Sequence, residues 1–214
     1  MKRRVLFAAT GLLGLSMLAP VVAQAQAQDN KVFRFVPHAN LAVLDPIWTT
    51  AYVTRNHAYM IYDTLFSEDA QGNIKPQMVD TYTTSTDRKT WTFKLRAGLE
   101  FHDGKPVTSE DVVASLKRWA SRDAMGGILN TFIDRYETPD ANTFRMVLKE
   151  PSGIVIDALG KASSNVPFIM PARIAATPGA EQIKEHIGSG PFIFKADEFK
   201  PGALAVYTRN AKYK

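Results

Sequence analysis

Apolar and polar residues alternate strictly between positions 91 and 96. Trp91, Phe93 and Leu95 fall on one face of an extended chain, and polar residues occupy the positions between them and after them. Successive side chains of a strand point to opposite faces, so this pattern predicts an antiparallel strand with one buried face.

A second alternating run covers residues 144–148. Turn-forming residues at 138–142 precede it, and a further β-prone stretch lies at 133–137. Two strand-like runs joined by such a segment predict a β-hairpin.

Helical spacing of apolar and aromatic residues appears between 49 and 66, which predicts an amphipathic helix over that range. Thr108, followed by acidic residues and then apolar positions, has the composition of a helix N-cap and first turn. Shorter helices are expected near 154–161 and 182–186.

Three more strands are expected, at 32–36 before Pro37, at 192–194 after a glycine-rich break, and at 204–207. Helices, hairpins and strands therefore follow one another without a linker or an internal repeat. The order predicts the α/β class, with helices and hairpins around a mixed sheet.

The first residues differ in composition from the rest of the chain. Three basic residues precede an uncharged apolar run from Val5 to Leu18, and small residues follow up to Ala27. This is the pattern of a secretory signal peptide, cleaved after Ala27 or Ala25. The alternative is an uncleaved membrane anchor, but the apolar run is shorter than the roughly 20 residues that a bilayer span needs.

The signal region changes the meaning of the net charge. Removing residues 1–27, with three of the 26 basic and none of the 21 acidic residues, lowers the formal charge from +5 to +2. The composition then gives little support for a nucleic-acid partner. We expect an exported protein of the periplasm.

Recognisable catalytic chemistry is missing from the sequence. There is no cysteine, the four histidines do not stand at metal-ligand spacing, and no G-x-S-x-G motif occurs. Gly188-Ser189-Gly190 lacks the lysine of a phosphate-binding loop. We expect no catalytic residue, no metal and no cofactor. A secreted hydrolase with an unrecognised site, or a secreted folding factor, is the alternative.

Binding chemistry is concentrated between residues 38 and 57, on an expected loop and the start of the following helix. Loops at the ends of strands commonly carry binding residues. In the competing interpretation Trp48 and Tyr52 belong to the core and Arg55 is a solvated helix residue. The polar and aromatic residues of the segment are His38, Asn40, Trp48, Tyr52, Arg55, Asn56 and His57.

One long segment, DRKTWTFKLRAGLEFHDGKPVTSEDV at 87–112, closely resembles the signature of the family 5 extracellular solute-binding proteins. These are the peptide, dipeptide and nickel-binding components of ABC importers. Shorter stretches are similar to the family in the same order, with departures such as Ala211 in place of proline. They are LDP at 44–46, YDTL at 62–65, PQMV at 76–79, GSGPF at 188–192 and RNAKY at 209–213.

The resemblance implies a two-lobed periplasmic binding protein more than twice this length. Residues 28–214 would form its N-terminal lobe, truncated before the second lobe. The function implied is capture of a peptide or other small solute by a monomer, closure of the cleft, and delivery to permease subunits in the inner membrane. By position, the residues expected to contact the ligand are His38, Ala39, Asn40, Trp48, Tyr52, Arg55 and His57.

Overall fold

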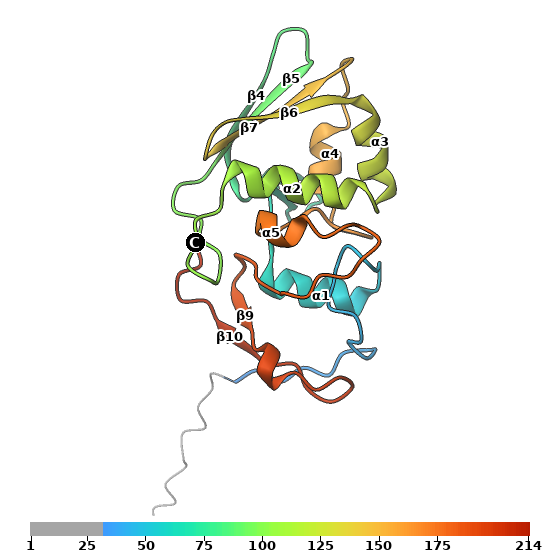
Figure 1. The fold of residues 1–214 in the computed structure, drawn as a ribbon, viewed down its shortest axis with the longest axis vertical. Helices are drawn as coiled ribbons and strands as arrows, with labels where there is room; N and C mark the ends of the chain where they lie inside the picture. Colours follow the sequence, from blue (N-terminus) through green and yellow to red (C-terminus); the bar gives the residue numbers. More distant parts are fainter. Residues whose placement is uncertain (1–31) are drawn as a thin grey trace, which may run out of the picture. The chain divides into compact units, whose positions relative to one another are not determined.

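A computed structural model describes residues 32–214 (Figure 1). The predicted signal peptide at 1–27 lies outside these residues. The chain divides into two units at Val36 and Pro37, and the fold below is that of residues 37–214.

The predicted strand at 32–36 is wrong. Phe33 and Val36 are 87% and 90% exposed, and no strand is formed there. A strand exists through hydrogen bonds to a neighbour, and no described residue pairs with this run. A β-prone composition alone is therefore insufficient to form a strand here.

A four-stranded antiparallel sheet contains the alternating segments. β5 (Thr90–Leu95) lies between β4 (Val79–Thr84) and β7 (Thr143–Leu148), and β6 (Ile133–Asp140) forms the far edge. The predicted strand and the predicted hairpin are confirmed. Phe93 of β5 faces Phe144 of β7, with ring centroids 4.8 Å apart and both side chains fully buried.

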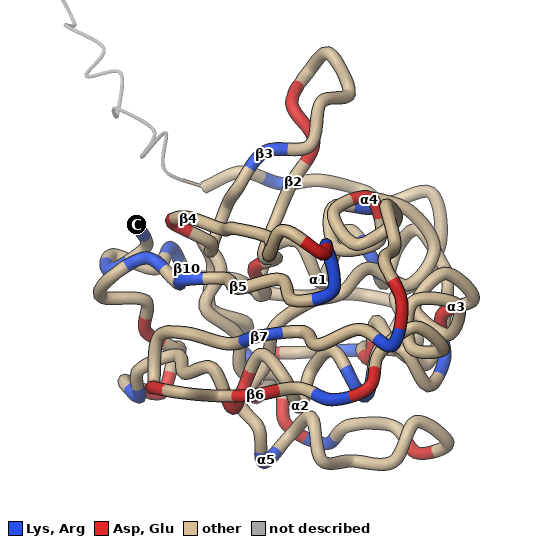
Figure 2. The backbone as a smooth tube through the Cα atoms, turned by 90° about the horizontal axis from the view of Figure 1, so that it is seen from above, with Lys and Arg blue, Asp and Glu red and all other residues tan. Residues whose placement is uncertain are grey.

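The outer strands of this sheet are polar. Acidic and basic residues lie close together along β6 (Figure 2), and Arg135 pairs with Asp134 and Glu137 at 2.8 and 2.9 Å. These pairs are largely exposed, and exposed ion pairs contribute little to stability.

α2 (Ser109–Ala120) packs against β6 and β7 of the sheet (Figure 1). It begins as predicted: the Thr108 hydroxyl accepts a hydrogen bond from the Asp111 amide, and the Asp111 carboxylate accepts one from the Thr108 amide at 2.8 Å. This capping box satisfies amide groups that the first turn leaves without partners. α3 (Ala124–Phe132) packs against α2 and β6, α4 (Val155–Gly160) packs against α3, and α5 (Ala172–Ala175) packs against the face of α2 that is turned away from the sheet (Figure 1).

α1 is shorter than predicted and covers Tyr52–Ile61. The backbone turns extended at Tyr62, then β1 (Asp63–Thr64) pairs with β8 (Phe168–Ile169), and β2 (Phe66–Glu68) pairs with β3 (Ile74–Pro76). Residues 61–66 are all buried, and periodicity does not distinguish a short buried strand from a buried helix end.

Close backbone packing fixes the end of α1. The Gly190 amide donates to the Ile61 carbonyl oxygen at 3.0 Å, and a Cβ atom added at Gly188 would collide with that same oxygen. The glycines of the GSGP break therefore allow two segments distant in sequence to touch.

The last hairpin pairs β9 (Phe192–Phe194) with β10 (Tyr207–Arg209), which begins three residues later than the start predicted at 204. A short 3-10 helix, η1 (Ala196–Glu198), lies between them. The helix predicted at 182–186 is wrong, because the Ile183 amide donates to the Asp45 carboxylate at 3.0 Å in an irregular segment. The α/β class is confirmed, and every strand pair found within 37–214 is antiparallel rather than mixed.

Candidate functional site

The loop before α1 is anchored by a buried ion pair. Asp45 binds the Arg118 guanidinium of α2 at 2.8 Å, and each side chain is 1% exposed. The Asp45 carboxylate also accepts hydrogen bonds from the amides of Ile47 at 2.9 Å and Ile183 at 3.0 Å. Because these bonds offset much of the cost of burying the charges, the loop is held in one conformation.

Asn165 fixes the same loop from the other side. Its side-chain amide donates to the carbonyl oxygens of Pro46, Ile47 and Thr49, at 2.8 to 3.2 Å. The backbone carbonyl oxygen of Asn165 accepts a hydrogen bond from the indole N–H of buried Trp119 at 2.8 Å. The start of α1 is thus positioned by residues that come more than 60 positions later in the chain.

Three of the predicted contact residues come together at the exposed start of α1. Tyr52 is 62% exposed, the Arg55 guanidinium lies 4.5 Å from its ring centroid, and the ring of His38 approaches edge-on at 6.4 Å. A guanidinium over an aromatic face is held in place while its charge stays available.

Trp48, Ala39 and Asn40 do not take part in these ring and guanidinium contacts. The Arg122 guanidinium covers the half-buried Trp48 ring at 5.2 Å, and Arg122 also donates to the Trp48 carbonyl oxygen at 3.3 Å. Ala39 and Asn40 are exposed in the loop, and Asn40 neighbours Gly202.

His57 faces the protein interior and is 3% exposed. Its Nδ1 atom is 2.6 Å from the Tyr207 hydroxyl, and its ring meets Phe194 edge-on at 4.9 Å. Burial, and then the nearby His186, lower the pKa of His57 to about 3, so its ring is neutral at ordinary pH. In this structure the ring packs α1 against the β9–β10 hairpin.

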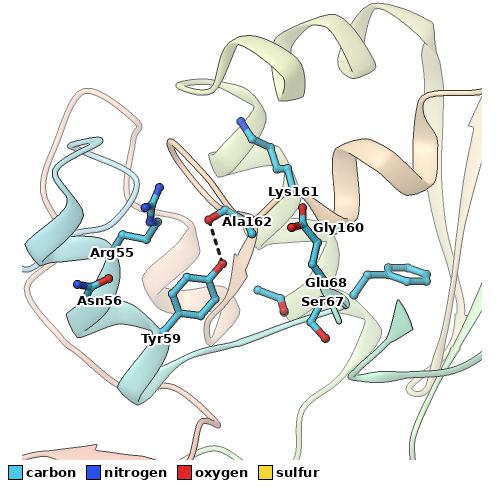
Figure 3. A pocket seen from close by; sticks show the side chains of 10 residues that line it. Arg55, Asn56, Tyr59, Ser67, Glu68, Gly160, Lys161 and Ala162 are labelled. Atoms are coloured by element: carbon cyan, nitrogen blue, oxygen red, sulfur yellow. Dashed lines mark hydrogen bonds between the residues drawn. The ribbon is translucent and has the colours of Figure 1, made fainter. Parts of the chain in front are cut away.

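A pocket of about 330 Å³ lies between α1, β2 and the segment after α4 (Figure 3). Of the predicted contact residues, only Arg55 lines it. Tyr59 is one turn further along the same face of α1, so helical spacing could have pointed to it, whereas Glu68 and Lys161 carry no such signal. The lining residues are Arg55, Asn56, Tyr59, Thr64, Phe66, Ser67, Glu68, Gly160, Lys161 and Ala162.

Metal and membrane features are not found in the described part of the chain. Residues 32–214 contain no cluster of three His, Asp or Glu side chains that could hold a metal ion. Within the same range, the helices lack the length and apolar character that a bilayer crossing requires.

Comparison with known proteins gives a clear family relationship. The sequence model of the bacterial extracellular solute-binding proteins, family 5, middle region, matches residues 73–214. The chain belongs to this family. The predicted resemblance is confirmed, and the members of the family bind solutes.

Two curated relatives illustrate the similarity. A probable peptide ABC transporter periplasmic-binding protein of Sinorhizobium fredii, y4tO, is 44% identical over 99% of this chain and 39% of its own length. The glutathione-binding protein GsiB of Escherichia coli is 28% identical over 86% of this chain and 35% of its own. The chain thus spans well under half of the relatives it matches.

Solved structures show the same fold. NikA from Brucella suis, in complex with Fe(III)-EDTA, has a TM-score of 0.70 at 25% identity, over 84% of this chain and 36% of its own. A mannopinic acid complex of MoaA from A. tumefaciens R10 has a TM-score of 0.68 at 28% identity, over 81% and 36%. The α/β fold described above is therefore part of the periplasmic binding protein fold.

Proposed function

We propose that this protein is the substrate-binding component of an ABC importer, which captures a peptide-like solute and delivers it to permease subunits in the inner membrane. The observation that carries the proposal is the family match over residues 73–214. The name of the S. fredii relative, a peptide-binding importer component, supports the peptide-like class of solute.

The location and organisation follow from the same proposal. Residues 1–27 act as a cleaved signal peptide that exports the chain to the periplasm, and residues 28–214 form the N-terminal lobe. A monomer closes by a hinge motion in which contacts to two lobes favour the closed state. Nucleic acid, a cofactor and a catalytic step have no part in this function.

The ligand-facing surface of this lobe is the exposed start of α1 with the loop before it. Tyr52 and Trp48 offer aromatic faces, each with a guanidinium above it, and His38 stands beside Tyr52. Aromatic faces and guanidinium groups suit the planar amides and carboxylates of peptide-like solutes. Ala39 and Asn40 flank this surface, and buried His57 supports it from within.

A thermal-shift titration tests the proposal. The protein is heated with a dipeptide mixture, glutathione, mannopinic acid or a nickel chelate, because binding to the native state raises Tm by mass action. We expect a concentration-dependent rise with the peptide-like solutes. Replacing Tyr52 by Ala should reduce that rise several-fold.

Tyr82 provides the matched control, because it is 41% exposed but lies on β4. Tyr82→Ala should leave the ligand-induced rise unchanged, whatever it does to Tm without ligand. A rise that is equal in Tyr52→Ala and in the unmodified protein would contradict the proposed surface. No rise with any peptide-like solute would contradict the proposed class of ligand.

A further inference from the structure

The pocket between α1, β2 and the segment after α4 carries opposite charges on its two sides. Arg55 and Glu68 lie on either side of Tyr59 in Figure 3. Both act on the same phenol: burial raises the pKa of Tyr59, Arg55 opposes that rise, and Glu68 adds to it. Because both side chains line this one pocket of about 330 Å³, the two charges can act on one bound molecule.

Neither of these charges is neutralised by its neighbours. Within residues 32–214, no carboxylate forms an ion pair with Arg55 and no cation pairs with Glu68. Lys161, the other cation of the pocket, differs because it binds the Asp123 carboxylate at 2.6 Å. The pocket thus presents one available cation and one available anion.

The pocket also has neutral polar groups and a small size. Asn56 and Ser67 line it, and the Tyr59 hydroxyl donates to the Ala162 carbonyl oxygen at 3.3 Å, which closes one wall. A volume of about 330 Å³ is at the lower end of ligand pockets, which run from roughly 300 to 1,000 Å³. The ligand must therefore be small.

We propose that this pocket binds an amino-acid-sized zwitterion, with its carboxylate at Arg55 and its ammonium group at Glu68. A simple anion would meet the Glu68 carboxylate and a simple cation would meet Arg55, so each is disfavoured by repulsion. The pocket goes beyond the proposed import function. It shares Arg55 with the ligand-facing surface, but it does not include Trp48 or Tyr52.

Three probes of matched shape and different charge test this site. L-glutamine is a zwitterion, N-acetyl-L-glutamine is an anion and L-glutaminamide is a cation at pH 7. Each is titrated into the ¹⁵N-labelled protein, and amide shifts around Tyr59 and Ser67 give both the place and the affinity. We expect L-glutamine to bind in the millimolar range, about tenfold more tightly than either capped form, because each lost end removes a charge-assisted hydrogen bond.

Two variants assign the two ends of the ligand. Glu68→Gln should weaken L-glutamine about tenfold and remove its advantage over the N-acetyl form. Arg55→Gln should remove its advantage over the amide form. The matched controls are Glu198→Gln and Arg209→Gln, exposed residues of η1 and β10, which should change nothing.

The outcomes separate this site from the import function. Equal affinity for the three probes, no shift near Tyr59 at tens of millimolar L-glutamine, or unchanged binding in Glu68→Gln would overturn the zwitterion site. Tyr52→Ala reports on the ligand-facing surface instead. Loss of the peptide response in Tyr52→Ala with retained L-glutamine binding supports both proposals as distinct sites.

Discussion

The four-stranded sheet and the loop before α1 are held together in different ways. In the sheet, the rings of Phe93 and Phe144 pack against each other, and each phenylalanine alternates with polar neighbours along its strand. In the loop, Asp45 is held by Arg118 and by the Ile183 amide, 73 and 138 positions away. The sheet is built from a repeating local pattern, and the loop from a few polar contacts between distant segments.

This difference bears on function, because the proposed ligand-facing surface belongs to the loop and to the helix it leads into. A surface that must keep Tyr52 exposed and Trp48 only half-buried gains little stability from burying them. Its order comes instead from the buried polar groups beneath it, Asp45 and Asn165. The loop should therefore be more sensitive to the loss of one polar group than the sheet is.

The largest expected effect is that of Arg118→Met. It leaves the Asp45 carboxylate buried without its cation, and breaking a buried pair in this way costs about 3 to 5 kcal/mol of the free energy of unfolding. Urea unfolding measures the loss. Arg135→Met on β6 is the control, because its ion pairs are exposed and worth roughly 0 to 1 kcal/mol.

The double variant Asp45→Leu with Arg118→Met sharpens this test. It removes the stranded charge, so it should be more stable than Arg118→Met alone. Similar losses in Arg118→Met and Arg135→Met would show that the loop does not depend on its buried pair.

Asp63 should give the next largest effect, in the form of a pH dependence. Its buried carboxylate accepts from Gln77 at 2.7 Å and from Tyr213 at 3.2 Å, and burial raises its pKa to about 6. The folded state then holds its proton more tightly than the unfolded chain, whose ordinary value is 3.8. Stability from this group is present below pH 4 and is lost as pH rises to about 6.

The comparison of the protein with Asp63→Asn isolates this group. As pH rises from 4 to about 6, the free energy of unfolding of the unmodified protein should fall relative to that of Asp63→Asn. The relative loss is roughly 1.4 kcal/mol per pH unit and up to about 3 kcal/mol in total. The comparison with the variant is needed because His57, whose pKa is lowered, has the opposite effect on stability. As pH falls below 6.5, His57 lowers the free energy of unfolding in both proteins alike. Parallel curves between pH 4 and 7 would contradict the raised pKa of Asp63.

Thr108→Ala should have the smallest of these effects. It removes the hydroxyl that caps α2 and should cost about 1 kcal/mol, within the range of 0.5 to 2 for such caps. Thermal unfolding measures it against Thr84→Ala, an exposed position at the end of β4. A loss as large as that of Arg118→Met would mean that local capping matters as much as the distant ion pair.

The elements predicted well are those whose signal is local. The strand at 91–96, the hairpin at 133–148 and the start of α2 follow from alternation, turn residues and a capping box. In the segments predicted wrongly, at 32–36 and 182–186, contacts with other parts of the chain decide the structure. The first has no strand partner among the described residues, and the second is fixed in an irregular course by Asp45.

The candidate site shows the same limit. Position along the chain pointed to Tyr52, Arg55 and His38, and the structure brings these three together. It also pointed to His57, whose ring is directed inward, because a helix of the right length can be placed with either face toward the core. Glu68 and Lys161 reach the pocket only through the packing of β2 and α4 beside α1.

The sequence by itself determined the family, the α/β class, the sheet strands and the start of α2, because these depend on motifs and on neighbours within a few residues. The tertiary structure decided where α1 ends, which ring of α1 faces inward, and that Arg55 and Glu68 share one pocket. These features depend on contacts between distant segments, such as Gly190 with Ile61 and His57 with Tyr207, which is 150 positions away. No local pattern records such contacts, because they arise only when the chain has folded.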